Sequence, residues 1–472
     1  MNHGLNLDYH RLCYKEINFG FFFSATYSLG FKSKFQKSFN LHMLHTTKTP
    51  SDHNMSQNDP KFRKRGQDVS EGSQFSRSSS LMEKMMESIQ LEEKLNPKVT
   101  LRRFLSVRSI ISTASSFAER QQAAVGTRSL FRSLGPGTCG RVYEVPGTTD
   151  IFKVANYPGQ DTDQLWNDYE MHNKVSEVFE KLGRDKIEVR VPRLKYFVGQ
   201  SDDIWWSENL DRFPLQFLKE PSNLLCAERI LPLAKPIRES LIDIYAPKGA
   251  DLQSFKADAS NKDCLVRMYL GKRRERVNNK FFQLRNFNLH LDQMEELDLN
   301  VFEFASAIGQ ALAIMHWACH LDANDVEFVL GSSPDLVAQP HLITTKPLSS
   351  EAIANMSPNT STWDAHINDF KKRTTHMWML DFNRCKVVST NVEKMLLQLV
   401  HSYFRNDPYF PRPVPPNSKD APLWDVFRRS YEEAASECIK RNLSPSGCSG
   451  LPHRFMDMVV AEQQKKVLER ST

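Results

Sequence analysis

Residues 135–155 read GPGTCGRVYEVPGTTDIFKVA, which is the stretch of the sequence most informative about the type of fold. Its first eight residues follow the pattern G-x-G-x-x-G-x-V, with Gly135, Gly137, Gly140 and Val142 at the fixed positions. Glycine lets a backbone approach phosphate oxygens and offer its N–H groups to them. A dinucleotide-binding fold needs a strand before such a loop and a helix after it. Here short β-rich runs flank the turn PGTT instead, so the sequence predicts a glycine loop that leads into a β-hairpin.

Lys153 lies on the second strand of this hairpin. A glycine loop above a hairpin that carries a lysine resembles the arrangement of protein kinases. In kinases the lysine holds the α- and β-phosphates and pairs with a glutamate on the next helix. The helical stretch DQLWNDYEMHNKVSEVFEKL offers Glu170 as that partner, with Glu177 as the alternative. The simpler interpretation is a surface hairpin with a glycine turn and a solvated lysine.

An apolar run enters a proline-containing connection at residues 224–233, LLCAERILPL. A strand followed by such a connection is typical of the hinge between two lobes, where backbone groups would hydrogen-bond an adenine ring. Glu228, Arg229 and Ile230 are the candidates for these contacts.

A strongly apolar helical pattern over 301–319 leads into the stretch HLDANDVEFVL, which begins at His320. Kinases use H-x-D-x-x-x-x-N before a short strand, where the Asp orients the acceptor hydroxyl and the Asn holds a metal ion. Asp322 fits the first role, and Glu327 stands at the Asn position. An oxygen ligand of either type suits Mg²⁺, although glutamate is longer and charged.

The second metal ligand is expected at the end of the next strand, in MWMLDFN, where Asp381 would bridge Mg²⁺ to the phosphates and Asn383 replaces the usual glycine. A polar insert at about 331–372 separates the two strands, and we expect it to be disordered. The motifs together predict ATP and Mg²⁺ as cofactors. The alternative is that Asp322 and Asp381 are capping or turn carboxylates.

Strand patterns followed by helical patterns predict an α+β protein with a two-lobed, protein-kinase-like fold. A small β-rich lobe comes first and a larger helical lobe follows. The expected segments are a disordered N-terminal arm at 1–95, a basic helical linker at 96–130, the glycine-loop lobe at 131–235, a mainly helical lobe at 236–445 and a C-terminal tail at 446–472. Met55 is an alternative first residue.

Charge is concentrated in one short segment of this chain of 472 residues and net charge +6. Residues 96–132 hold seven Lys and Arg and a single acid, while the remainder is close to balanced. The spacing of Phe104, Val107, Ile110 and Ile111 predicts a broken amphipathic helix packed on the main body. A docking arm for an acidic partner, in a nuclear regulator, is the alternative. A general nucleic-acid-binding surface is not indicated.

Composition excludes several classes of protein. No run approaches the length of apolar chain that spans a bilayer. The eight cysteines form no C-x-x-C pair and no Cys/His set with zinc-finger spacing, so we expect reduced thiols and no bound zinc. A cytoplasmic or nuclear protein is therefore expected.

Several segments resemble a fungal family known only as domain of unknown function 3669. They are CAERILPL, LVRMYLGKRR, ALAIMHWACHLDANDVEFVLGS, MWMLDFNRC and NDPYFPRPVP. The resemblance covers roughly residues 130–440 and implies no established activity. Members are sometimes labelled zinc finger proteins, but this chain carries no finger. Only RCKVVSTN separates Asp381-Phe382 from the next helix, so the pattern is more similar to aminoglycoside and choline kinases than to regulated protein kinases.

Two functional hypotheses follow. The first is a divergent kinase-like domain that binds ATP and Mg²⁺ and transfers phosphate to a hydroxyl acceptor. The second is a pseudokinase-type module that uses the same cleft or its surface to engage a protein partner. The retained Lys153, Asp322 and Asp381 favour transfer, whereas the changes at Glu327 and Asn383 favour the binding module.

Overall fold

The computed structural model describes most of the chain from Asn96 onward. The described ranges are 96–112, 116–156, 162–183, 186–274, 282–336, 368–406, 408–444 and 447–471. The chain divides into two units, Met1–Ser70 and Glu71–Thr472, and every described residue belongs to the second. The predicted disordered arm at 1–95 and the alternative start at Met55 lie outside the described residues.

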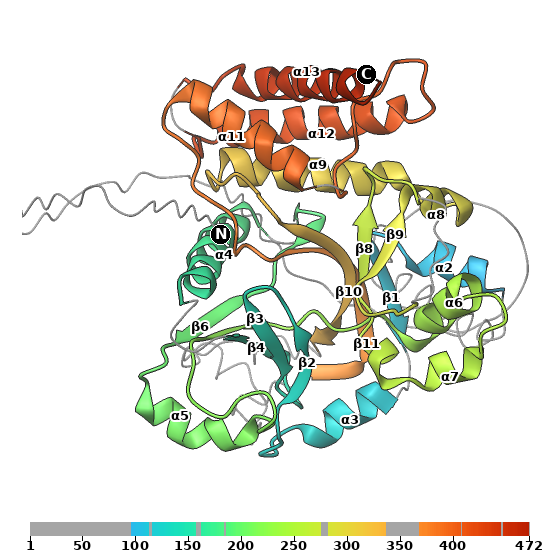
Figure 1. Ribbon diagram of the computed structural model, residues 1–472, viewed down its shortest axis with the longest axis vertical. Coiled ribbons are helices and arrows are strands. Elements are labelled where there is room, and N and C mark those ends of the chain that lie inside the picture. The colour runs from blue at the N-terminus through green and yellow to red at the C-terminus, as the bar shows by residue number, and fades with distance from the viewer. Residues whose placement is uncertain are drawn as a thin grey trace, which may run out of the picture. The chain divides into compact units, whose positions relative to one another are not determined.

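The glycine-loop region forms a five-stranded antiparallel sheet in the order β2-β3-β4-β7-β6 (Figure 1). These strands are β2 (Arg132–Pro136), β3 (Gly140–Glu144), β4 (Asp150–Ala155), β6 (Leu194–Val198) and β7 (Leu224–Glu228). The predicted hairpin is therefore confirmed as β3 and β4. One face packs against aromatic residues of α5 (Asp203–Asn209) and its flanks, with Phe131, Phe152 and Phe213 in mutual ring contact. Helix α4 (Thr162–Leu182) connects β4 to the later strands and contacts β4, β6 and β7.

A second sheet has the order β1-β11-β10-β8-β9, with β5 added in parallel to β11. Its strands are β1 (Arg108–Ser112), β5 (Val189–Arg190), β8 (Val266–Tyr269), β9 (Phe287–His290), β10 (Glu327–Leu336) and β11 (Asn368–Leu380). Strands β10 and β11 pair along nearly their whole length. The predicted disordered insert at 331–372 is therefore wrong at both ends, because residues 331–336 and 368–372 are strand; its middle lies outside the described residues.

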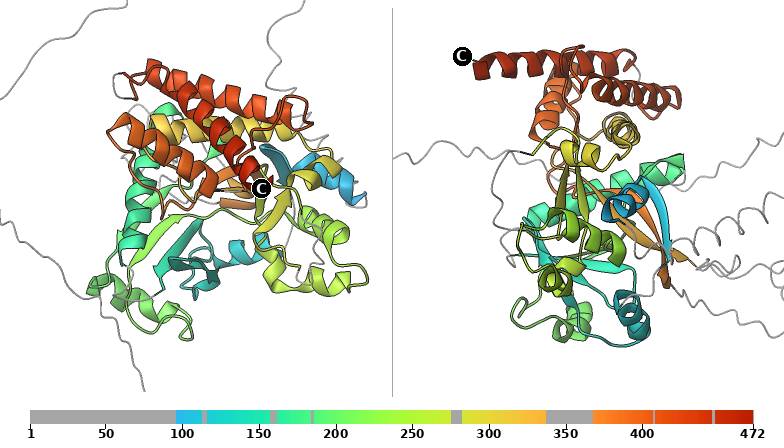
Figure 2. Two further views of the ribbon diagram at one scale, coloured as in Figure 1. Left: turned by 45° about the horizontal axis from the view of Figure 1, so that its top comes forward. Right: turned by 90° about the vertical axis from the view of Figure 1, so that its right-hand side faces the viewer.

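Helices stack on this sheet in layers (Figures 1 and 2). Helix α9 (Val301–Trp317) is buried almost all round, because it lies between the strands and α12 (Ala421–Lys440). Helices α11 (Val392–Arg405) and α13 (Leu451–Ser471) complete the stack, and α13 occupies the expected tail. Shorter helices are α6 (Lys235–Tyr245), α7 (Leu252–Ala257) and α8 (Leu291–Glu296). The α+β class is confirmed. Among the described residues, no helix combines the length and apolarity needed to cross a membrane.

The basic segment packs on the main body, as predicted, but it is not one broken helix. It forms α2 (Pro97–Phe104), β1 and α3 (Ser116–Ala124). Helix α2 packs against α6, while Ile110 pairs with Thr374 of β11. Successive side chains of a strand point to opposite faces, so the helical spacing that includes Ile110 and Ile111 does not describe this segment.

Helix α3 braces both sheets near the hinge. Phe117 is buried between the guanidinium groups of Arg229 and Arg373, whose carbons lie 5.3 and 5.2 Å from its ring centre. Gln121 accepts a hydrogen bond of 2.9 Å from the Gly147 N–H in the turn before β4, and its amide bonds to Glu144. One short helix therefore touches the small sheet, the hinge and the large sheet.

Candidate functional site

A cleft of about 280 Å³ lies where the small sheet meets strands β8, β10 and β11. Most of the residues predicted for a nucleotide site line this cleft. They are Gly135, Gly137, Val142, Lys153, Glu228, Arg229, Ile230, Glu327 and Asp381. The other three, Gly140, Glu170 and Asp322, do not line it.

The glycine loop closes one side of the cleft. The Gly137 N–H donates to the Gly140 carbonyl at 2.7 Å, and the Asn156 side-chain amide donates to the Gly137 carbonyl at 3.0 Å. A Cβ on Gly140 would lie 2.7 Å from the backbone oxygen of Val154, so only glycine fits there. Gly140 therefore shapes the loop from behind rather than facing a ligand. Asn156 is a loop-holding residue that the sequence analysis did not identify.

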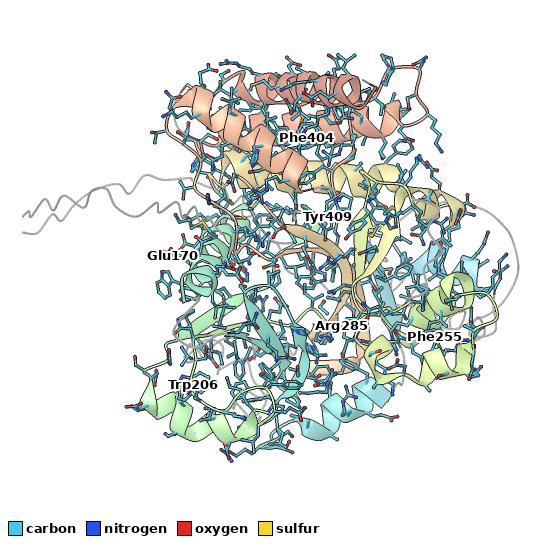
Figure 3. All side chains as sticks on the ribbon, in the orientation of Figure 1. Glu170, Trp206, Phe255, Arg285, Phe404 and Tyr409 are labelled. Carbon is cyan, nitrogen blue, oxygen red and sulfur yellow. The ribbon has the colours of Figure 1, made fainter. Side chains whose placement is uncertain are left out.

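Arg285, labelled in Figure 3, lines the cleft and lies against the glycine loop at Gly135. A Cβ on Gly135 would overlap the Arg285 guanidinium, at 1.6 Å from its nearest nitrogen. The absence of a side chain at Gly135 is thus what lets this cation reach the loop. Sequence alone gives no reason to bring Arg285 here, because it is 150 residues away in the chain.

Lys153 is the centre of a charged network inside the cleft. Its Nζ lies 2.7 Å from Oδ2 of Asp168 and 3.0 Å from Oδ1 of Asp381. The other oxygen of Asp168 accepts the backbone N–H of Phe382 at 3.0 Å. Burial alone would lower the pKa of Lys153, but the two carboxylates outweigh it and hold the pKa well above its usual value. Lys153 is therefore a fixed cation at this site.

The predicted partner of Lys153 is corrected from Glu170 to Asp168. Glu170 is exposed on α4, on the side away from the cleft (Figure 3). The buried face of α4 carries Leu165, Met171 and Val175, and Asp168 falls on that face, three residues after Leu165. The apolar spacing of α4 in the sequence therefore indicates Asp168 as the buried carboxylate. The kinase pattern, which has a glutamate at this point, favoured Glu170 instead.

Helix α4 also holds the segment that follows Asp381. The Asn167 side-chain amide donates to the carbonyls of Asn383 and Cys385 at 2.9 and 3.1 Å. Together with the Asp168 contact to Phe382, this fixes the backbone around Asp381, which has a φ of 66°. Two adjacent polar residues of one helix therefore determine where the Asp381 carboxylate points.

Glu327 lines the cleft but is bound to a cation of the chain itself. Its Oε1 lies 2.6 Å from an Nη of Arg267. Burial raises the pKa of Glu327 to about 7, Arg267 opposes that rise, and the Asp381 carboxylate adds to it. The sequence pattern predicts a metal ion at Glu327, whereas the contact with Arg267 depends on the pairing of β8 with β10.

Asp322 does not have the position predicted for a residue that orients an acceptor. It is 4% exposed. Its Oδ1 accepts the backbone N–H of Lys386 at 2.9 Å and of Asn324 at 3.2 Å, and its Oδ2 accepts the Gln398 side chain at 2.9 Å. Asp322 therefore joins the loop after α9 to the segment after Asp381 and to α11. The alternative of a turn carboxylate fits this geometry.

A buried arginine lies directly after β7, in the connection predicted to be a hinge. The Arg229 guanidinium lies 3.2 Å from Glu144 and 3.7 Å from Asp263. Its backbone N–H donates to the Thr149 carbonyl at 2.7 Å, so it is not available to a base. The neighbouring N–H of Ile230 has no acceptor among the described residues.

Cys139, Asp168 and Asp381 form a compact group in which one ligand-type atom of each lies within 4.8 Å of the others. The Lys153 ammonium already contacts both carboxylates of this group. Burial raises the pKa of the Cys139 thiol, with Lys153 acting in the opposite direction. The seven cysteines that the structure describes are all buried and free of disulfides, as predicted for them.

One family is matched by part of this chain. A DUF3669 domain, described as zinc finger protein, spans residues 377–443. It covers the end of β11, the segment around Asp381, α11 and α12. The resemblance given above for residues 130–440 is thus borne out over this portion alone. A comparison with curated proteins finds no match.

Proposed function

We propose that the cleft binds a purine nucleoside triphosphate and that the protein is a kinase-like binding module that does not transfer phosphate. The observation that carries this proposal is the network of Lys153 with Asp168 and Asp381 beneath a glycine loop. Kinases use a lysine, a helix carboxylate and a strand-end Asp in these relative positions.

The strand order supports the same interpretation. A five-stranded antiparallel sheet, with one helix inserted after the third strand, presents the glycine loop and Lys153 on the same hairpin. Apolar residues from β3, β4 and β7 line the cleft beside the hinge, which suits the flat faces of a base. The unengaged N–H of Ile230 could bond a ring nitrogen.

Three features favour binding over transfer. The Asp322 carboxylate is engaged by two backbone N–H groups and an amide, so it has no free oxygen directed at an acceptor. Glu327 is paired with Arg267. Asn383 replaces the glycine that follows Asp-Phe in kinases. Phosphate transfer remains the second candidate because Lys153 and Asp381 are retained.

The experiment is thermal unfolding of the full chain with ATP, GTP, adenosine or tripolyphosphate. A ligand at 100 times its Kd should stabilise the fold by about 2.7 kcal/mol. We expect stabilisation by a triphosphate nucleotide in the wild type and its loss in Lys153→Met, which removes the central cation of the network. Lys256→Met is the matched control, since Lys256 is a partly buried lysine paired with Asp243 outside the cleft. Stabilisation of all variants alike would refute the proposed site.

A further inference from the structure

The two carboxylates predicted to bind a metal ion, and Asp168 beside them, are already paired with cations of the chain. Asp168 and Asp381 share the Lys153 ammonium. Glu327 pairs with Arg267 at 2.6 Å. Even Asp325, two residues before Glu327, lies 3.2 Å from Arg384. A divalent ion bridging Glu327 and Asp381 would have to displace both an arginine and a lysine from contacts shorter than 3.1 Å.

The Arg267 contact follows from sheet geometry rather than from a chance side-chain placement. Arg267 on β8 stands opposite Val329 on β10. Glu327 lies two residues before Val329, so its side chain is on the same face of the sheet, diagonal to Arg267. A diagonal neighbour is within reach of a long side chain. The pair is therefore fixed by backbone pairing on two adjacent strands.

Arg267 also lines the cleft, and its contact with Glu327 does not use all the N–H donors of its guanidinium group. Its side chain is 25% exposed, although its Nε, which has no hydrogen-bond partner among the described residues, is buried, and Tyr269 also hydrogen-bonds the side chain. A guanidinium carries five N–H donors in a planar fork that matches both carboxylate and phosphate oxygens. Arg267 can therefore donate one N–H group to Glu327 and another to a phosphate oxygen.

These observations show that the expected Mg²⁺ does not fit the residues present. We infer that the cleft binds its nucleotide without a divalent metal ion and that Arg267 supplies the positive charge at the Glu327 position. This inference rests on the proposed nucleotide-binding function and defines the form of ligand: the free triphosphate rather than its metal complex. Lys153 and Arg267 then flank the phosphates from opposite walls of the cleft.

The test is ATP binding to the full chain by calorimetry, in EDTA and in excess Mg²⁺. We expect the affinity in EDTA to equal or exceed the affinity with Mg²⁺. Binding only in the presence of Mg²⁺ would overturn the inference and leave the proposed function intact. No binding of any nucleotide in either buffer would overturn both.

Two variants make the role of Arg267 specific. Arg267→Met should weaken ATP binding in EDTA by roughly tenfold or more, the loss expected for one charge-assisted hydrogen bond. Mg²⁺ should restore part of that binding, because Glu327 becomes available as a ligand. Glu327→Gln should retain binding in EDTA, since it removes only the competing acceptor, whereas a loss of binding there would contradict the inference. If Arg267→Met fails to fold, Glu327→Gln still tests the inference.

Arg428→Met is the matched control. Arg428 has a similar exposed fraction, 30% against 25%, and pairs with Glu432 and Asp457 on helices away from the cleft. Its loss should leave ATP binding in EDTA unchanged. An equal weakening in Arg267→Met and Arg428→Met would show that any arginine loss acts through stability, and the specific role of Arg267 would be refuted.

Discussion

Replacement of Asp322 by alanine tests whether this residue is a structural carboxylate. The substitution removes the acceptor for the N–H groups of Lys386 and Asn324 and for the amide of Gln398. Leaving a buried donor without an acceptor costs about 1–3 kcal/mol. The Lys386 contact is 2.9 Å long and partly buried, whereas the Gln398 amide keeps a second acceptor in the Val387 carbonyl at 3.3 Å. We therefore expect Asp322→Ala to lower the free energy of unfolding by about 1–2 kcal/mol.

The assay is equilibrium urea unfolding of the full chain, with Asp325→Ala as the matched control. Asp325 is three residues away, but its side chain is 41% exposed and its partner Arg384 is also exposed. A surface pair contributes about 0–1 kcal/mol. The stability of Asp322→Asn should lie between those of Asp322→Ala and the wild type, because the asparagine keeps one oxygen for the two backbone N–H donors. If Asp322→Ala is no less stable than Asp325→Ala, the structural role assigned to Asp322 is wrong.

Three further predictions concern the frame around the cleft. Phe117→Ala should lower the free energy of unfolding by about 3–5 kcal/mol in urea, because it leaves a cavity between two buried guanidinium groups. A decrease of less than about 1 kcal/mol would contradict the bracing role of α3. Gly140→Ala should lower the free energy of unfolding by about 1–3 kcal/mol, because the new Cβ meets the Val154 oxygen. Gly199→Ala, which has open space around it, should be near neutral in the same urea unfolding assay. Burial lowers the pKa of His316 to about 3, below the value of about 6.5 in the unfolded chain. Between these two pH values the unfolded chain binds a proton that the folded chain does not. The free energy of unfolding should therefore fall by about 1.4 kcal/mol for each unit that the pH drops between about 6.5 and 3. His316→Asn should remove that contribution from the pH dependence of unfolding, and an unchanged slope would count against it.

Local patterns predicted the parts of the cleft that depend on neighbours in sequence. The glycine spacing and the turn PGTT predict the hairpin that the structure shows, and Lys153 and Asp381 line the same cleft. These features depend on backbone conformations that a few adjacent residues determine. Asp168 was also within reach, because the apolar period of α4 puts it on the buried face.

Long-range pairing could not be predicted in the same way. The contact of Arg267 with Glu327 requires that β8 and β10 pair in one register, and the strand at Arg108–Ser112 exists because β11 offers an edge more than 250 residues later in the chain. A short apolar run fits a helix or a strand equally well until its partner is known. The role of Asp322 likewise depends on Gln398, a residue of a helix beyond the site.

The brace formed by α3 has a consequence for the kinetics of ligand exchange. Phe117 and Gln121 connect the small sheet to the large one beside the hinge, and the contact of Lys153 with Asp381 connects them again inside the cleft. With these two connections in place, rotation of one sheet against the other is restrained. A bound nucleotide would leave mainly through movement of the glycine loop, so we expect long residence times at a given affinity. Loosening α3 should speed both entry and release while changing the equilibrium less.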